Sequence, residues 1–130
     1  MAATPGTATP LAAKANGTTP PPRRTGRDRV PPHPDVRTVG LQQAMEALVD
    51  PVRRLIVREL HAAHQDLACG AIDLPVGKST ATHHFHVLRE AGLIRQYYVG
   101  TSRMNALRAE EFDEAFPGLL GAVVGTPEQR

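Results

Sequence analysis

The chain has only one cysteine among its 130 residues, Cys69. A single thiol cannot form a disulfide within the chain, and it cannot supply a tetrahedral metal site made of cysteines alone. The sequence also lacks any apolar run of about 18 residues, the length that a transmembrane helix requires. These absences favour a protein of the reducing cytoplasm that does not span a membrane.

The N-terminal stretch has few acidic residues and no Phe, Trp or Tyr, and it is rich in proline. Residues 1–35 hold eight of the twelve prolines. Such a stretch cannot bury enough apolar surface to offset the entropy that is lost on ordering. It also lacks the apolar run of a secretory signal. We therefore expect residues 1–38 to be a disordered tail rich in Pro, Ala, Thr and Arg, and residues 39–125 to form one folded domain.

Basic charge is unevenly distributed along the chain. Residues 1–39 contain six lysine and arginine residues against two aspartates, whereas the formal net charge of the whole chain is +2. The expected domain is therefore slightly acidic, and nucleic-acid binding cannot be inferred from its net charge. Binding to DNA would depend on individual basic side chains. The tail would either add sequence-independent attraction to phosphates or be a solvated linker.

Apolar residues recur at helical spacing over two successive segments, Leu41–Val49 and Val52–Ala63. The dipeptide Asp50-Pro51 separates them. Asp is a preferred N-cap residue, and proline is favoured in the first turn of a helix. The sequence therefore predicts two helices, with Asp50 capping the second.

Three further elements follow before the last helix. We expect a short helical segment within Cys69–Leu74, which ends before a proline. A third apolar stripe predicts a helix over about Thr80–Ala91, with Ser79 as its N-cap and Gly92 at its C-terminal end. Residues 93–107 contain strand-forming residues on both sides of a Gly-Thr-Ser turn, so they predict a β-hairpin.

A last helical stretch begins near Ala109, where four acidic residues suit the positive end of the helix dipole. Pro117-Gly118 interrupts it, and an apolar stretch continues to Val124. The order helix, helix, short helix, helix, hairpin, helix (α-α-α-α-β-β-α) is that of a winged helix-turn-helix domain, mainly α with a small β-hairpin.

Gly77-Lys78-Ser79 matches the end of a phosphate-binding loop, G-x-x-x-x-G-K-[ST]. The first glycine of that loop is missing, because Ile72 stands five residues before Gly77. The sequence also lacks the alternating strands and helices that build a parallel sheet around such a loop. We therefore do not expect a nucleotide-binding protein or an enzyme.

In a winged helix-turn-helix domain the second helix of the motif enters the major groove of DNA. The start and the outward side of the predicted Thr80–Ala91 helix carry short hydrogen-bonding or cationic side chains, and both arms of the hairpin carry an arginine. The candidate DNA contacts are Lys78, Ser79, Thr80, Thr82, His83, His86, Arg89, Arg95 and Arg103. His84 shares a helical face with Phe85 and Leu88, so we expect it to pack inside the protein.

Three segments resemble the ArsR-type (arsenical-resistance repressor) family of bacterial transcriptional regulators. They are "ALVDPVRRLIVREL" (Ala47–Leu60), "KSTATHHFHVLREAGLI" (Lys78–Ile94) and "YYVGTSRMNAL" (Tyr97–Leu107). The resemblance covers about Leu41 to Val124. It implies a repressor that binds a palindromic operator in double-stranded DNA as a homodimer, without catalysis.

The resemblance also implies that the first and last helices form the dimer. About 85 ordered residues give only a marginal core of their own, and the apolar end of the chain has no evident partner within it. The expected dimer contacts are Leu41, Met45, Leu48, Phe112, Phe116, Leu119, Leu120 and Val123.

Many ArsR-type regulators sense metals, but this sequence lacks their usual ligand pairs. The segment "DLACGAIDL" has no Cys-x-Cys, and residues 109–124 contain no His or Cys. We therefore expect no cofactor. The alternatives are a metal- or redox-responsive repressor that uses His61, His64 and Cys69, with Asp66 between them, and a winged helix used only for protein contacts.

Overall fold

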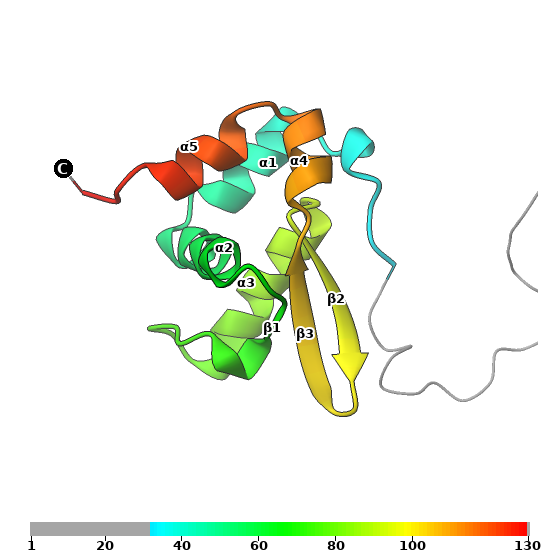
Figure 1. The fold of residues 1–130 in the computed structure, drawn as a ribbon, viewed down its shortest axis with the longest axis vertical. Coiled ribbons are helices and arrows are strands. Elements are labelled where there is room, and N and C mark those ends of the chain that lie inside the picture. Colours follow the sequence, from blue (N-terminus) through cyan, green and yellow to red (C-terminus); the bar gives the residue numbers. More distant parts are fainter. Residues whose placement is uncertain (1–31, 130) are drawn as a thin grey trace, which may run out of the picture.

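Residues 32–129, the part of the chain that the computed structural model describes, form five α-helices and a small antiparallel sheet (Figure 1). The helices and strands are α1 (Leu41–Leu48), α2 (Pro51–Ala63), β1 (Leu67–Ala68), α3 (Lys78–Glu90), β2 (Ile94–Val99), β3 (Ser102–Leu107), α4 (Ala109–Ala115) and α5 (Leu119–Gly125). Single 3-10 turns lie at Val36–Thr38 and Cys69–Ala71. This is the expected winged helix-turn-helix architecture.

The boundary between α1 and α2 is the one that the sequence predicts. The Asp50 side chain accepts hydrogen bonds from the backbone N–H groups of Val52, at 2.8 Å, and Arg53, at 3.4 Å. Pro51 occupies the first turn of α2. The N–H groups of that turn have no partner within the helix, so the missing N–H of proline costs no hydrogen bond there. Local side-chain chemistry therefore fixes this corner.

The start of α3 differs from the prediction. The helix begins at Lys78 with Gly77 as N-cap, and Ser79 lies inside the first turn without capping it. The backbone N–H of Ala81 donates to the Gly77 carbonyl at 2.9 Å. The first helical turn therefore begins at Gly77, before the Ser79 cap that the sequence predicts. A backbone turn with no side-chain cap sets this boundary.

The end of α3 is as predicted. Gly92 has a φ of +79°, in the left-handed region that favours glycine. The backbone N–H of Leu93 donates to the Leu88 carbonyl at 3.0 Å, and that of Gly92 donates to the Arg89 carbonyl at 3.1 Å. These two bonds form a Schellman motif, which turns the chain from the helix into β2.

The hairpin is confirmed, and it belongs to a larger sheet than expected. Strands β2 and β3 pair antiparallel around the turn at Gly100-Thr101, and β1 pairs with the other edge of β3 in the order β1-β3-β2. The sequence did not predict β1, and the helix expected over Cys69–Leu74 is only one 3-10 turn. Because β1 pairs with a strand almost 40 residues later, no local pattern could reveal it.

The structure describes residues 32–38, which the prediction assigned to the tail. Val36 lies in a 3-10 turn and is 2% exposed, in the same core as α2, α3 and α4. The Arg108 side chain donates to the Pro34 carbonyl at 2.9 Å. The rest of the predicted tail, residues 1–31, lies outside the described residues, and its disorder stays a prediction.

The core lies where the helices meet the end of the hairpin that contains Leu93 and Ile94. Its largest fully buried side chains come from α2, α3, the start of the hairpin and α4: Ile56, Val57, Leu88, Leu93, Ile94 and Phe112. Helix α5 packs against α2, and this contact buries Leu120. None of the helices in residues 32–129 is long and apolar enough to cross a membrane.

Replacing Gly92 with alanine should destabilise the protein more than the same change at Gly118. Both glycines have positive φ, so both substitutions introduce backbone strain of about 1 kcal/mol. A methyl group at Gly92 would also lie 3.0 Å from Val36 Cγ2, whereas one at Gly118 meets nothing within 4 Å. We expect about 1 kcal/mol of additional destabilisation for Gly92→Ala, measured by urea unfolding. Equal losses for the two variants would show that Val36 does not lie against Gly92.

Candidate nucleic-acid interface

The outward face of α3 is polar and accessible. Six of its side chains are exposed: Lys78, Ser79, Thr80, Thr82, His83 and His86. No acidic residue lies in the first turn, so nothing there repels a phosphate. The Thr82 hydroxyl donates to the Lys78 carbonyl at 3.0 Å, so it offers an outside partner its acceptor lone pairs and its methyl group. The structure brings these sequence-predicted residues together on one surface.

The inward face of α3 is fixed to the rest of the domain, and His84 lies on it as expected. Arg53 Nη1 lies 3.0 Å from His84 Nδ1, and the same guanidinium donates to the carbonyls of Ala47 and Glu46 at the end of α1. Arginine can only donate, so Nδ1 of His84 is the acceptor. Burial lowers the pKa of His84 below its usual value, and Arg53 adds to this effect while Asp50 opposes it. His84 is thus a neutral packing residue.

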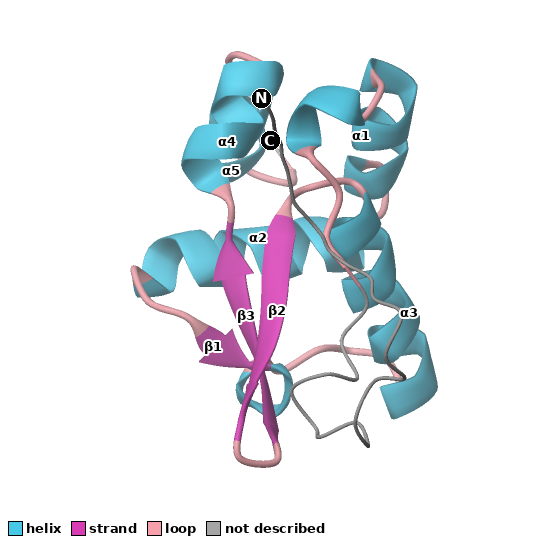
Figure 2. Ribbon diagram, turned by 90° about the vertical axis from the view of Figure 1, so that its right-hand side faces the viewer, coloured by secondary structure: helices cyan, strands magenta, loops and turns pink. Residues whose placement is uncertain are grey.

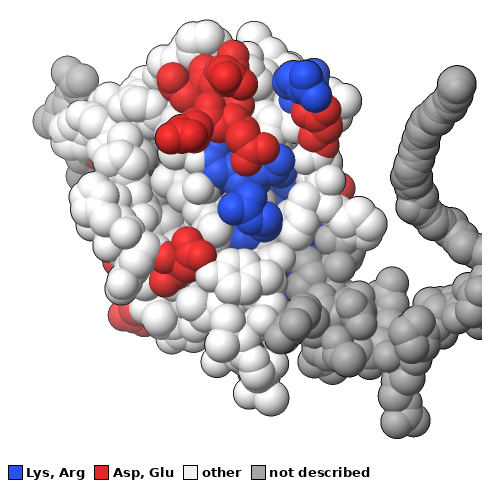
Figure 3. All heavy atoms as spheres, turned by 45° about the vertical axis from the view of Figure 1, so that its right-hand side comes forward, with Lys and Arg blue, Asp and Glu red and all other residues white. Residues whose placement is uncertain are grey.

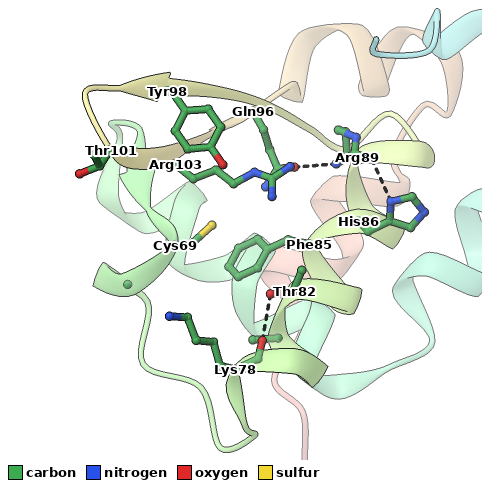
Figure 4. Close-up of a pocket in the computed structure, with 12 residues that line it drawn as sticks. Cys69, Lys78, Thr82, Phe85, His86, Arg89, Gln96, Tyr98, Thr101 and Arg103 are labelled. Carbon is green, nitrogen blue, oxygen red and sulfur yellow. Dashed lines mark hydrogen bonds between the residues drawn. The ribbon is translucent and has the colours of Figure 1, made fainter. Parts of the chain in front are cut away.

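Arg89 does not belong to the exposed surface, which corrects the prediction that it contacts DNA. Its side chain is 3% exposed. It donates to the Gln96 amide oxygen at 2.9 Å and to His86 Nδ1 at 2.8 Å (Figure 4). Because Nδ1 accepts this bond, the neutral His86 ring carries its proton on Nε2, as a donor. Arg89 therefore orients a helix side chain and joins α3 to β2.

The two hairpin arginines lie on opposite faces of the sheet. Tyr98 pairs with Arg103 and Arg95 pairs with Ala106, and side chains alternate between faces along a strand. Arg95 is exposed, whereas Arg103 is partly buried with its guanidinium 5.8 Å from the centre of the Tyr98 ring. Figure 4 shows Arg103 on the side of the hairpin that faces α3. The sequence placed both on the wing but could not assign their faces.

On one face of the molecule, basic side chains are interspersed with acidic ones. Figure 3 shows red acidic side chains gathered directly beside blue basic ones on one face of the molecule. Arg108, for example, forms an ion pair with Glu111 at 2.9 Å, which lowers the pKa of the Glu111 carboxyl. This face is therefore not a broad basic surface, in keeping with the slightly acidic composition of the domain.

The exposed side of α3 and the hairpin together have the geometry of a DNA-reading unit, and the chain is similar to known regulators. Over 80 residues it is 35% identical to the uncharacterized HTH-type transcriptional regulator YceK of Bacillus subtilis, a match that covers 60% of this chain and 80% of that protein. The chain belongs to the HTH-type transcriptional regulators.

Two further comparisons agree with this assignment. The regulator is 40% identical over 67 residues to the HTH-type transcriptional regulator Rv2034 of Mycobacterium tuberculosis, which covers 50% of this chain and 61% of that protein. A solved ArsR family transcriptional regulator, RHA00566, has the same fold, with a TM-score of 0.52, 23% identity, and coverage of 67% of this chain and 98% of that one. The fold that the ArsR-type resemblance implies is thus confirmed. No family model matches the chain.

The candidate metal ligands of this regulator are divided between two hollows. His61, His64 and Asp66 line one hollow of about 250 Å³, and Cys69 lines another, between α3 and the hairpin. Asp66 accepts a hydrogen bond from the Tyr97 hydroxyl. Within residues 32–129 no three His, Cys, Asp or Glu side chains are placed to hold a metal ion. The metal-responsive alternative therefore lacks a ligand set in the described part of the chain.

The residues expected at a dimer interface divide into two groups. Leu48, Phe112 and Leu120 are buried within the single chain, so their assignment to a dimer contact is corrected. Leu41 and Met45 are 58% and 52% exposed, and Phe116, Leu119 and Val123 are half-buried. Val49, which the prediction omitted, is 71% exposed. Leu41, Met45 and Val49 recur every four residues, so α1 has one apolar stripe inside and another outside.

Sequence reasoning missed the buried polar side chains of the hairpin. Gln96 Nε2 donates to Asn105 Oδ1 at 2.8 Å, and Asn105 Nδ2 donates to the Leu67 carbonyl at 3.1 Å and lies 3.2 Å from Cys69 Sγ. These bonds extend from Arg89 and link α3, β2, β3 and β1. A signal existed, because Gln96 alternates with Ile94 and Tyr98 on the inward face of β2.

The prediction also missed the contact that fixes the end of the chain on α2. Glu128 accepts hydrogen bonds from Arg54, at 2.8 Å, and from Arg58. Both guanidinium groups lower the pKa of the Glu128 carboxyl, to about 2. The charges of Arg54 and Arg58 are therefore paired with Glu128, and these two side chains are not available to bind a DNA phosphate.

Proposed function

We propose that this chain is a cytoplasmic repressor that binds a palindromic DNA operator as a homodimer, with α3 in the major groove and the β2–β3 hairpin against the phosphate backbone. Figure 2 places the hairpin tip and the lower part of α3 at one end of the molecule, and α1, α4 and α5 at the other. Contact with DNA at the first end would leave the second free to join two subunits.

The observation that carries the proposal is the division of α3 into a polar exposed face and a rigidly held inner face. His83 and Thr82 project short polar groups that can meet base edges, and Lys78 supplies a charge for a phosphate. Arg53 holds the opposite side of the helix through His84. A helix that is held in this way can present its outer side chains in one fixed geometry.

Dimer formation is supported by the apolar stripe of Leu41, Met45 and Val49, which no described part of the chain covers. The half-buried apolar groups Leu119 and Val123 on α5 would add to the covered area. An exposed apolar strip on a soluble regulator is typical of a protein contact. A second copy related by a two-fold axis would match the two halves of a palindrome.

Binding to DNA should depend on His83 and Lys78 in different ways. We expect His83→Ala to lower the affinity for a duplex selected from a random pool by about tenfold, and to change the affinity for unselected DNA much less. Lys78→Ala should weaken both, and should reduce the slope of log affinity against log salt concentration by about 1. Fluorescence anisotropy over a salt series measures both quantities.

His61→Ala is the matched control, because His61 is also an exposed histidine but lies on α2, outside the proposed interface. It should bind the selected duplex as the wild type does. If selection enriches no sequence, or if His83→Ala and His61→Ala bind equally, the assignment of α3 as the reading helix is wrong. DNA affinity that is absent even at low salt would favour a winged helix used for protein contacts.

A further inference from the structure

A hollow of about 650 Å³ lies between α3, the turn that contains Cys69, and the hairpin (Figure 4). Small-molecule sites in proteins have volumes of about 300–1,000 Å³. Contact with DNA uses the exposed side chains of α3 and does not by itself require a cavity between α3 and the hairpin. An occupant would touch the reading helix and the wing at the same time.

One wall of the hollow is apolar. Figure 4 shows the Phe85 ring and the Cys69 sulfur on this side, and the Arg103 side chain between them and the Tyr98 ring. Phe85 belongs to the hydrophobic core, so its ring is a fixed wall. An aromatic ring on one side and a planar guanidinium on the other suit a flat group between them.

The charged side chains of the hollow are all positive. Lys78, Arg89 and Arg103 line it, and none of the lining residues is Asp or Glu. In residues 32–129 neither Lys78 nor Arg103 forms an ion pair with a carboxylate. Cations in a concave, partly apolar site raise the local concentration of anions.

Two of these cations have an unmet hydrogen-bonding group. The Nε–H groups of Arg89 and Arg103 are buried and have no hydrogen-bond partner in the described part of the chain. Such groups are rare in folded proteins, because a buried donor without an acceptor costs free energy. Arg103 is also held by the Tyr98 ring instead of by a carboxylate. Because both Nη groups of Arg89 are already bonded, the guanidinium of Arg103 is the fork that matches the two acceptor oxygens of a carboxylate.

We propose that this hollow binds a small organic anion with a planar apolar body, such as an aromatic carboxylate, and that the bound anion releases the protein from DNA. Lys78, Thr82 and His86 line the hollow and also lie on the exposed face of α3. An occupant that contacts them therefore competes with DNA for the same groups. The binding site stands on its own geometry, and only the release step rests on the proposed function.

Titration of the full chain without DNA tests the site directly. The probes are benzoate, its neutral analogue benzamide, and inorganic phosphate, which is an anion without an apolar body. In nuclear magnetic resonance spectra benzoate should shift the signals of Phe85 and Tyr98 to saturation. Benzamide and phosphate should each bind at least about tenfold more weakly, because benzamide lacks the negative charge and phosphate lacks the apolar body.

Two variants test the site without relying on one substitution. Arg103→Met should lower the benzoate affinity at least about tenfold, because it removes a charged donor and keeps the length of the side chain. Gly70→Leu keeps all three cations, and its added side chain enters open space at the wall of the hollow. It should also weaken binding. The control Arg37→Met removes an exposed arginine far from the hollow and should leave benzoate affinity unchanged.

The outcomes separate the site from the proposed function. Absence of a saturable shift at Phe85 and Tyr98, or equal effects of Arg103→Met and Arg37→Met, would overturn the site. Phosphate binding as tight as that of benzoate would show a general phosphate site, of the kind that a DNA backbone occupies, and would also overturn it. If benzoate saturates the protein and its affinity for the selected duplex stays the same, the release step is wrong. A wild type that binds benzoate and no DNA supports the site and refutes the proposed function.

Discussion

Phe112→Ala should lower the free energy of unfolding by about 3–5 kcal/mol. The Phe112 side chain is fully buried, and its ring centre lies 4.9 Å from that of Phe116. Truncation removes this ring from the contact between α4 and the core and leaves a cavity. Domains of this kind are stable by about 5–15 kcal/mol, so a large share of the total stability is at stake. Urea unfolding followed by circular dichroism at low protein concentration measures the loss.

Met45→Glu is the contrasting variant, because Met45 is exposed on α1 and belongs to the proposed dimer surface. It should sediment as a single chain where the wild type sediments as a dimer, while its unfolding at low protein concentration changes little. If Phe112→Ala unfolds at the same urea concentration as the wild type and only its association changes, Phe112 is a dimer contact and the packing described for α4 is wrong.

Arg89→Met should lower both stability and DNA affinity, although Arg89 is buried and does not face DNA. The change removes the donor of the bond to Gln96, whose amide oxygen is then buried without this partner, and it removes the bond to His86. We expect a loss of about 1.5–3 kcal/mol in the free energy of unfolding, the range for hydrogen bonds to charged groups. Operator affinity should fall about tenfold, because His86 and the wing lose their fixed position relative to α3.

Arg95→Met is the control for stability, since it removes an exposed arginine from the other face of the same hairpin. Its urea unfolding should match that of the wild type. A double-mutant cycle that combines Arg89→Met with Gln96→Ala should give a coupling free energy of about 0.5–3 kcal/mol. Additive effects, or equal stability of Arg89→Met and Arg95→Met, would show that the buried hydrogen bond between α3 and β2 is not formed.

The predictions from sequence succeeded where the signal is local. Asp50-Pro51 fixes the corner between α1 and α2 through bonds to the next two N–H groups. Gly92 ends α3 because its positive φ favours a residue without a Cβ. The hairpin is set by a short turn between two β-forming segments. Each of these features depends on neighbours within a few residues, so the sequence contains all the necessary information.

The predictions failed where the outcome depends on which face of an element meets a distant partner. Leu41 and Leu48 share one apolar stripe in the sequence, yet Leu41 is exposed and Leu48 is buried. Arg89 was assigned to the DNA surface because it is charged, although its spacing of four residues from Phe85 already placed it on the inner face. The Ser79 cap failed because the turn before α3 closes through the backbone of Gly77.

The sequence by itself determined the order of elements of a small winged helix-turn-helix domain, because periodicity and turns follow from the chemistry of nearby residues. Only the tertiary structure decided that Arg89 joins α3 to the hairpin, that Arg103 and Lys78 line one hollow, and that Leu41, Met45 and Val49 stay exposed. These facts arise from the burial of polar and apolar faces against elements far apart in the chain. Burial is a property of the packed molecule, and no local pattern contains it.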